Sequence, residues 1–162
     1  MADGRSEGER GEGSQVLIHE LSDDECRTIL ARTNLARLCC SRHDQPYVVP
    51  VYVYFDDGCF YGFATLGQKI EWMRENPKVC VEIDDVADES TWTTIVAFGR
   101  YEEITDAPED SDARSRAREL FERRRNFWLP AAAKLASAEH AAPVVYRIRI
   151  DRLTGRSAAR HI

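Results

Sequence analysis

The sequence has no apolar run approaching the length of a membrane-spanning helix, and its first residues have no apolar core typical of a signal peptide. It also has no excess of positive charge, because its 162 residues carry a formal net charge of −6. A chain of this charge is poorly suited to bind nucleic acid or an anionic membrane as its main partner. We therefore expect a cytoplasmic globular protein that acts on neither nucleic acid nor a membrane.

Cysteine is present, but not in a pattern typical of a disulfide framework or a zinc site. The five cysteines are odd in number and include no C-x-x-C pair. Cys39 and Cys40 are neighbours on a predicted strand, so their side chains should point to opposite faces. We expect all five to be small buried or half-buried thiols in a reducing cytosol, and we predict no metal site. The acidic run from Asp84 to Glu89 lacks the glycine and ligand spacing of a calcium loop, which favours a solvated surface.

The length of the chain favours a single domain. Residues 1–14 consist mainly of Gly, Glu, Arg and Ser with almost no apolar side chain, which predicts a disordered tail. The remaining residues, 15–162, contain no internal repeat and no linker that would divide them. They are predicted to form one domain.

Helical signals occur in three places besides the short helix discussed below. Ser22-Asp23-Asp24-Glu25 has the pattern of a capping box and predicts a helix running to about Arg32. The spacing of apolar residues predicts a second helix over residues 108–125, whose arginines alternate with acids and therefore indicate a solvated face. Residues 131–142 are predicted to form a further short helix and a loop.

The rest of the sequence alternates in the manner of strands. Pro50 lies inside one of them and cannot donate to a ladder, so that strand should have an edge, a bulge or an unpaired stretch there. Gly99 predicts a bulge or a close approach in another. Six strands at short spacing are typical of a small antiparallel barrel. They are predicted at Leu35–Ser41, Pro46–Phe55, Cys59–Ala64, Lys78–Val86, Trp92–Glu103 and Pro143–Leu153.

The segment between the third and fourth of these strands has the residues of an anion-binding site. Thr65 supplies a hydroxyl, Gly67 supplies flexibility, and Lys69 supplies a positive charge at the start of a short predicted helix. Asn76-Pro77 ends this helix, because the residue before a proline is disfavoured in the α conformation. The unpaired N–H groups and the positive dipole end of a helix N-terminus stabilise a phosphate. The alternative is a capped surface helix whose lysine faces water, and the spacing alone does not decide between the two.

The order of these parts resembles a known superfamily. The sequence has D-Q-P-Y-V-V-P-V at 44–51, D-D-G at 56–58, T-x-G-x-K at 65–69, W-x-T-x-x-x-x-G at 92–99 and T-G-R at 154–156. This succession is similar to that of the pyridoxamine 5′-phosphate oxidase-like, FMN-binding split-barrel superfamily. Within it, the chain most resembles the small flavin-nucleotide-binding and nitroimidazole-resistance (Nim) type proteins. The resemblance covers about residues 21–156.

The resemblance implies a mainly β (α+β) fold, a six-stranded antiparallel split β-barrel with flanking helices. It also implies a homodimer that holds two FMN molecules in clefts between its subunits. The flavin phosphate would lie at the strand-to-helix turn, and the isoalloxazine ring would lie along residues 48–52. A residue of the W-x-T motif would contact either the ring or the ribityl chain. The cofactor-binding residues implied in this way are Val49, Pro50, Val51, Phe63, Ala64, Thr65, Gln68, Lys69, Trp92 and Thr94.

Two departures from the pattern bear on activity. Pyridoxamine phosphate oxidases proper have a phosphate-binding arginine near the position of Val49 and a substrate-binding arginine and histidine near the C-terminus, none of which has a counterpart here. Nim-type members often have a histidine near the flavin where this chain has Phe63. We therefore expect no oxidation of pyridoxamine phosphate, whereas flavin binding is unaffected.

Three functions remain compatible with the resemblance. The first is an FMN-dependent oxidoreductase that moves hydride or electrons between a reduced nicotinamide and a small organic acceptor, with the flavin supplying the redox chemistry. The second is a flavin-binding carrier or sensor without turnover. The third is a related split barrel that uses deazaflavin or haem. No side chain has the neighbours that would identify it as a catalytic acid or base.

Overall fold

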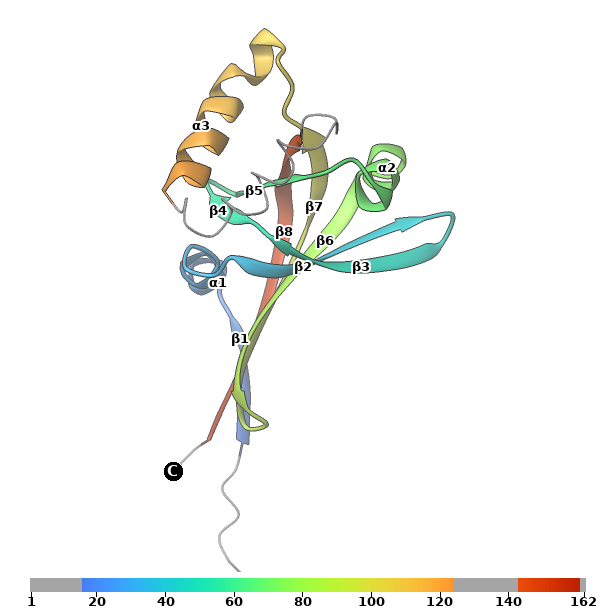
Figure 1. The fold of residues 1–162 in the computed structure, drawn as a ribbon. Coiled ribbons are helices and arrows are strands. Elements are labelled where there is room, and N and C mark those ends of the chain that lie inside the picture. Colours follow the sequence, from blue (N-terminus) through green and yellow to red (C-terminus); the bar gives the residue numbers. More distant parts are fainter. Residues whose placement is uncertain (1–15, 124–142, 161–162) are drawn as a thin grey trace, which may run out of the picture.

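The computed structural model describes residues 16–123 and 143–160, and Figure 1 shows their arrangement. The predicted tail at 1–14 and the predicted helix and loop at 131–142 lie outside these ranges. No helix in the described ranges is long and apolar enough to cross a membrane. The elements are, in order, β1 (Val16–Leu21), α1 (Asp23–Leu30), β2 (Leu35–Arg42), β3 (Gln45–Tyr52), β4 (Tyr54–Asp56), β5 (Cys59–Ala64), α2 (Gln68–Glu75), β6 (Lys78–Asp88), β7 (Thr91–Glu103), a 3-10 turn (Pro108–Asp110), α3 (Ser111–Glu122) and β8 (Val144–Arg160).

The described strands form one antiparallel sheet in the order β3-β2-β6-β7-β8-β5-β4, with β1 paired to β8. On one edge, β8 pairs with β5 along its first residues and with β1 along its last residues. On the other edge, β8 pairs with β7. The two end strands of this order, β3 and β4, are consecutive in the chain and are joined by Val53. The strands therefore curve into a mainly β barrel that is split between β3 and β4, with α1, α2 and α3 around it (Figure 1).

The predicted fold class is confirmed, but the predicted number of six strands is corrected to eight within residues 16–123 and 143–160. One difference arises at Val53, which interrupts the predicted strand 46–55. The Val53 N–H donates to the backbone carbonyl of Asn34 at 2.9 Å instead of continuing the ladder. The side-chain amide of Asn34 donates to the Val53 carbonyl at 3.0 Å. The other difference is β1, which was not predicted. It pairs with the end of β8, which continues to Arg160 instead of ending at Leu153.

The local signals of the sequence are confirmed where they concern turns and helix ends. The capping box forms, with the Ser22 N–H donating to Glu25 Oε2 at 2.8 Å and the Ser22 hydroxyl accepting from the Glu25 N–H at 3.4 Å. Asp57 and Gly58 both have positive φ, at 43° and 73°, as a tight two-residue hairpin turn requires. Pro50 lies on an end strand of the sheet, and the backbone of β8 approaches Gly99 closely where the pairing of β7 with β8 shifts by one residue on β8.

Two groups of buried side chains hold the fold together. The larger group fills the barrel and includes Phe60 and Tyr146, both fully buried. A smaller group lies between α3 and the β4–β5 hairpin, where Ala117 and Leu120 pack against strand residues. The apolar residues of α3, whose spacing predicted this helix, therefore form the face that packs on the barrel. The remaining members of the smaller group are Tyr54, Tyr61, Ile104 and Ala113.

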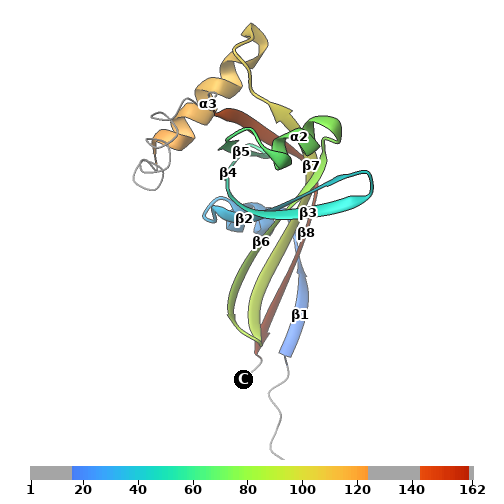
Figure 2. The same cartoon turned by 45° about the vertical axis from the view of Figure 1, so that its right-hand side comes forward.

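One end of the sheet extends beyond the barrel as an arm, which we define as residues 16–21, 84–94 and 154–160. In Figures 1 and 2 these strands project away from all three helices as a single layer. Large apolar side chains are exposed on it: Leu17 to 45%, Ile18 to 60% and Val86 to 61%. Leu17 and Ile18 are neighbours on a strand and so point to opposite faces, which means that both faces of the arm carry exposed apolar surface.

Candidate functional site

The junction between β5 and α2 brings together the residues expected to bind phosphate. β5 ends at the buried Ala64, Thr65 is exposed, and Gly67 precedes α2 in an extended conformation. α2 is anchored by Ile70 and Met73, both fully buried. The helix ends before Asn76-Pro77, as predicted.

The N-terminus of α2 differs from that of α1 in a way that favours a ligand. The first turn of α1 is capped by its own Ser22 and Glu25 and carries three acidic residues. The first turn of α2 has no side-chain cap, because Gly67 occupies the cap position. Its unpaired N–H groups and positive dipole end can therefore receive an anion from outside the helix.

Lys69 lies in this first turn and is half-buried. Burial lowers its pKa, and the nearby Cys40 only partly opposes that shift. Across the described residues, no carboxylate lies within ion-pair distance of its ammonium group. A partly desolvated cation without an acidic partner is stabilised by an anionic ligand, so the side chain fits a phosphate.

The residues expected along the flavin ring lie on β3 and at the end of β5. Val51 is buried, Val49 is half-buried and Pro50 is exposed opposite Arg37 of β2. β3 is an end strand of the sheet, so its outer edge faces no other described strand. Phe63 is half-buried, with its ring centroid 5.0 Å from that of Phe121 on α3.

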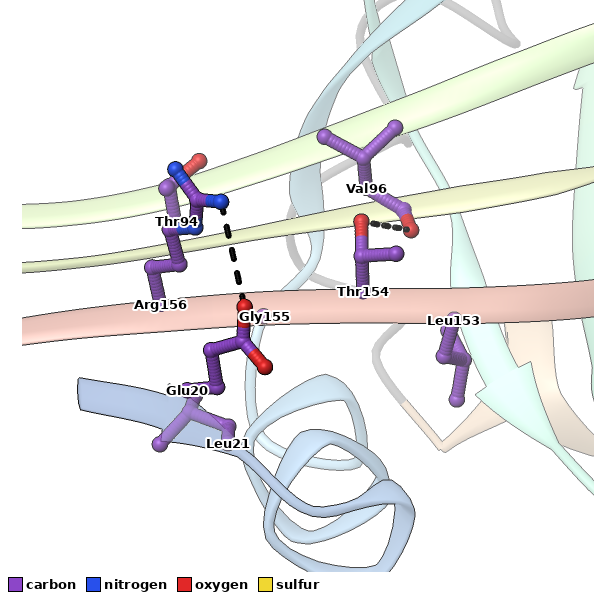
Figure 3. Close-up of a pocket in the computed structure, with 8 residues that line it drawn as sticks. All are labelled: Glu20, Leu21, Thr94, Val96, Leu153, Thr154, Gly155 and Arg156. Carbon is purple, nitrogen blue, oxygen red and sulfur yellow. Dashed lines mark hydrogen bonds and ion pairs between the residues drawn. The ribbon is translucent and has the colours of Figure 1, made fainter.

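Thr94 lies in a different place, in a groove of about 450 Å³ over the junction of β7, β8 and β1. Its hydroxyl donates to Glu82 Oε1 at 3.3 Å. Arg156 is the direct partner of Thr94 on β8 and pairs with Glu20 at 3.8 Å, as Figure 3 shows. Trp92 is half-buried and lies two residues before Thr94 on β7. The groove is lined by Glu20, Leu21, Thr94, Val96, Leu153, Thr154, Gly155 and Arg156.

The predicted site residues therefore fall into two separate places in one chain. Lys69 approaches Cys40, whose side chain faces the barrel interior, whereas Thr94 shares the outer face of the sheet with Glu82. The register also separates them along the strands. Cys39, the neighbour of Cys40, pairs with Cys80 on β6, and Thr94 pairs with Asp84 on the same strand. The four residues from Cys80 to Asp84 correspond to about 13 Å.

Sequence reasoning missed two neighbours of these positions. Cys40, next to Lys69, was considered only as a buried thiol. Arg156 was noted in the T-G-R motif but was not expected to line a groove with Thr94. The signal for Arg156 was present in that motif, but its contact with Glu20 depends on the pairing of β1 with β8.

The family follows from the sequence match. Residues 22–157 match the family model described as pyridoxamine 5′-phosphate oxidase. The chain belongs to this family. An uncharacterized protein of Rhizobium meliloti, RA0666, is 36% identical over 146 residues, which are 88% of this chain and 97% of that protein. The resemblance inferred from the order of motifs is thus confirmed at the level of the family.

Solved structures of the same fold support this assignment. A FAD-binding protein of Mesorhizobium loti is 34% identical and superposes with a TM-score of 0.73, covering 90% of this chain and 99% of that chain. The FAD-binding protein of Mycobacterium smegmatis is 18% identical, has a TM-score of 0.59 and covers 85% of this chain and 98% of that one, which shows the shared fold alone.

Proposed function

We propose that this member of the pyridoxamine 5′-phosphate oxidase family binds FMN and is a flavin-dependent oxidoreductase. The observation that carries the proposal is the uncapped first turn of α2 with the half-buried Lys69, which has no acidic partner among the described residues. The Mesorhizobium relative, a FAD-binding protein, supports a flavin at 34% identity. FMN and FAD share the riboflavin 5′-phosphate unit, so the same turn can hold that phosphate in either cofactor.

The residues of the chain would bind and orient the cofactor. Lys69 would pair with the phosphate, Thr65 and the first N–H groups of α2 would donate to it, and the backbone edge of β3 would lie along the ring. When bound, the flavin would supply the redox chemistry: it would accept hydride from a reduced nicotinamide and pass electrons to a small organic acceptor. Pyridoxamine phosphate is not the proposed substrate, because this chain has no counterpart of the arginine near Val49, or of the arginine and histidine near the C-terminus, that pyridoxamine phosphate oxidases proper have.

The working unit in this proposal is a homodimer in which each site takes residues from both subunits. One chain places Lys69 and Thr94 on opposite faces of its sheet. If both contact one flavin, the second copy must supply one of them. The exposed apolar side chains of the arm provide a surface for that copy. We assign Lys69 to one subunit and Thr94 to its partner.

Mixed dimers test this arrangement. A Lys69→Ala chain and a Thr94→Val chain carrying different affinity tags are co-expressed, and the heterodimer is isolated through both tags. If each site combines Lys69 from one chain with Thr94 from the other, the heterodimer has one intact site and binds FMN at half the wild-type stoichiometry with wild-type affinity. Weak binding at both sites, as in the two variant homodimers, would place both residues in the same subunit and contradict the assignment.

The cofactor and the activity are tested separately on the purified protein. Its visible spectrum and the mass of the ligand released on denaturation identify the flavin, and titration of the ligand-free protein compares FMN, FAD and riboflavin. Anaerobic addition of a reduced nicotinamide should then bleach the bound flavin, and an added quinone or nitro compound should restore it. A flavin that no nicotinamide reduces would indicate a carrier or sensor. A haem or deazaflavin spectrum would overturn the proposal.

A further inference from the structure

Two cysteines face each other across the junction of β2 and β6. Cys39 and Cys80 are direct partners in the antiparallel register, so their side chains lie on the same face of the sheet. Both are half-buried and both are free thiols. Directly opposed residues of an antiparallel pair have Cα atoms about 4.5–5.5 Å apart, which is within the range that a disulfide spans.

The position of the pair within the sheet is unusual. The pairing of β2 with β6 runs only from Arg37–Glu82 to Cys39–Cys80, whereas β6 pairs with β7 along most of its length. Beyond Cys39 the chain leaves β6, and Asn76 next to α2 donates to the Ser41 carbonyl at 3.1 Å. The two thiols therefore lie at the end of a short seam that attaches the β2–β3 hairpin to the rest of the barrel.

We propose that Cys39 and Cys80 are a redox modification site, at which the two thiols are oxidised to a cross-strand disulfide that locks the seam between β2 and β6. The pair alone among the described cysteines has this geometry. Cys40 points into the barrel core, Cys59 lies opposite Arg149, and Cys26 is buried on α1. The proposal does not depend on flavin binding, since it rests on strand register alone.

The oxidant in this step is a low-molecular-weight disulfide such as oxidised glutathione. One thiolate attacks it, forms a mixed disulfide and releases one glutathione thiol. The second cysteine then attacks the protein sulfur of the mixed disulfide, forms the Cys39–Cys80 bond and releases the second glutathione. Two electrons pass from the protein dithiol to glutathione disulfide, and the two thiol protons end on the two glutathione molecules.

The surroundings of the pair make this exchange slow at neutral pH. Burial, followed by the facing Cys80 thiol and the carboxylate of Glu82, raises the pKa of Cys39 to about 11. Arg37 is the cation on the same face, and it pairs with Glu82 at 3.1 Å and also with Asp84. The Cys39 thiolate is therefore scarce at neutral pH, and the rate of oxidation should rise with pH.

The experiment follows the thiols of the full-length protein in a series of glutathione redox buffers at pH 8. Samples are quenched with a thiol-alkylating reagent, and their intact mass and tryptic peptides are measured. We expect the oxidised protein to carry three alkyl groups where the reduced protein carries five, and the peptides of β2 and β6 to be joined. The oxidised protein should also have a higher thermal midpoint, because the bond constrains the unfolded chain.

Variants distinguish the proposed pair from general thiol reactivity. Cys39→Ser and Cys80→Ser should each abolish the cross-link. Cys40→Ala is the matched control, because Cys40 adjoins Cys39 in sequence but faces the interior, and it should leave the cross-link intact. Cys59→Ser serves the same purpose without altering a fully buried position. Free thiols at Cys39 and Cys80 in the most oxidising buffer, mixed disulfides alone, or a cross-link to any other cysteine would overturn the proposal.

Discussion

Lys69 illustrates how one residue can be placed by local sequence and yet depend on its surroundings for its role. The helix start was readable from Gly67 and the stop from Asn76-Pro77, but the sequence did not show whether the lysine faces water. The structure makes it half-buried, and burial lowers its pKa. An anion would stabilise the charged form of a lysine in that setting, and the uncapped first turn of α2 can bind the same anion.

We predict that Lys69→Ala weakens FMN binding about 10- to 150-fold, since a charge-assisted contact contributes about 1.5–3 kcal/mol. Thr65→Val removes a neutral donor and should weaken binding less, by about 0.5–1.5 kcal/mol. Riboflavin lacks the phosphate, so its affinity should barely respond to either change. Titration by flavin fluorescence measures all of these affinities. Lys78→Ala is the control, because this exposed lysine lies outside the site. Equal losses for FMN and riboflavin would contradict the placement of the phosphate.

Gly99 and Gly67 differ in the space around them, and this predicts different effects of an alanine substitution on stability. An added Cβ at Gly99 would overlap the carbonyl oxygen of Arg149, a backbone atom of the paired strand, whereas one at Gly67 would meet nothing within 4 Å. Gly99→Ala should therefore lower the free energy of unfolding by about 1–3 kcal/mol, as overpacking does. Gly67→Ala should change it by about 0.5 kcal/mol or less. Urea denaturation of the ligand-free proteins measures both, and equal effects would show that the bulge relaxes.

At the scale of elements, the helices are attached to the barrel in different ways. α1 is capped by its own residues, and α3 packs through its apolar face and through Arg116, which donates to Asp56 at 2.6 Å. α2 is tied to β7 by polar contacts. Arg74 pairs with Glu103 at 2.5 Å, and the Tyr101 hydroxyl donates to the same carboxylate at 2.8 Å. The ion pair attaches the C-terminal turn of α2 to β7, and the Tyr101 hydroxyl orients the carboxylate that Arg74 contacts.

The tie between α2 and β7 predicts a pH dependence of stability. The hydrogen bond from Arg74 holds the pKa of Glu103 below its ordinary value. A carboxyl group whose pKa is depressed by folding stabilises the fold above its unfolded pKa, and that contribution is lost as the pH falls through the folded value. Glu103→Gln should therefore destabilise the protein at pH 7, by about 1 kcal/mol or less because Arg74 is half-exposed. The difference from wild type should begin to shrink as the pH falls below about 4.5, the ordinary pKa of the group, and should disappear once the pH is below its lowered pKa.

Denaturation at pH 7, 5 and 3.5 measures this effect. Glu75→Gln is a suitable control, because Glu75 lies on the same helix and pairs with Arg42 at the surface, at 2.8 Å. It should change stability less than Glu103→Gln does at pH 7. The free energy of unfolding of Glu103→Gln could also differ from that of wild type by the same amount at every pH. That result would show that the substitution acts through packing and not through the charge of Glu103.

For the whole molecule, the arm is the feature on which the proposed dimer rests. A single sheet layer with exposed apolar side chains on both faces is rare on a monomer, since such surface is normally covered. A second copy of the chain would cover it, with on the order of 2,000 Å² buried, as is typical of obligate dimers.

We predict that sedimentation equilibrium gives twice the chain mass at micromolar concentration, and that Ile18→Glu shifts the protein toward monomer. Ile18 is exposed to 60%, so the substitution is tolerated by the isolated chain but places a charge in the proposed interface. Leu35→Glu is the control, since Leu35 is exposed to 51% but lies outside the arm. FMN binding should fall with dimerisation in the Ile18 variant. A monomer that still binds FMN with wild-type affinity would contradict the shared site.

The sequence by itself determined the features that depend on neighbouring residues. Backbone preferences and short hydrogen bonds specify the capping box at Ser22, the turn at Asp57-Gly58 and the end of α2 at Asn76-Pro77. These interactions are complete within a few residues, so their signals survive in any tertiary context. The succession of such signals was also enough to identify the family.

Only the tertiary structure decided which distant segments meet. β1 has no buried face of its own, and its strand conformation follows from pairing with residues 155–160 of β8. The opposition of Cys39 and Cys80 and the separation of Lys69 from Thr94 likewise depend on the register between strands far apart in sequence. Register is set by the packing of the whole sheet, because a shift of one residue would exchange its two faces.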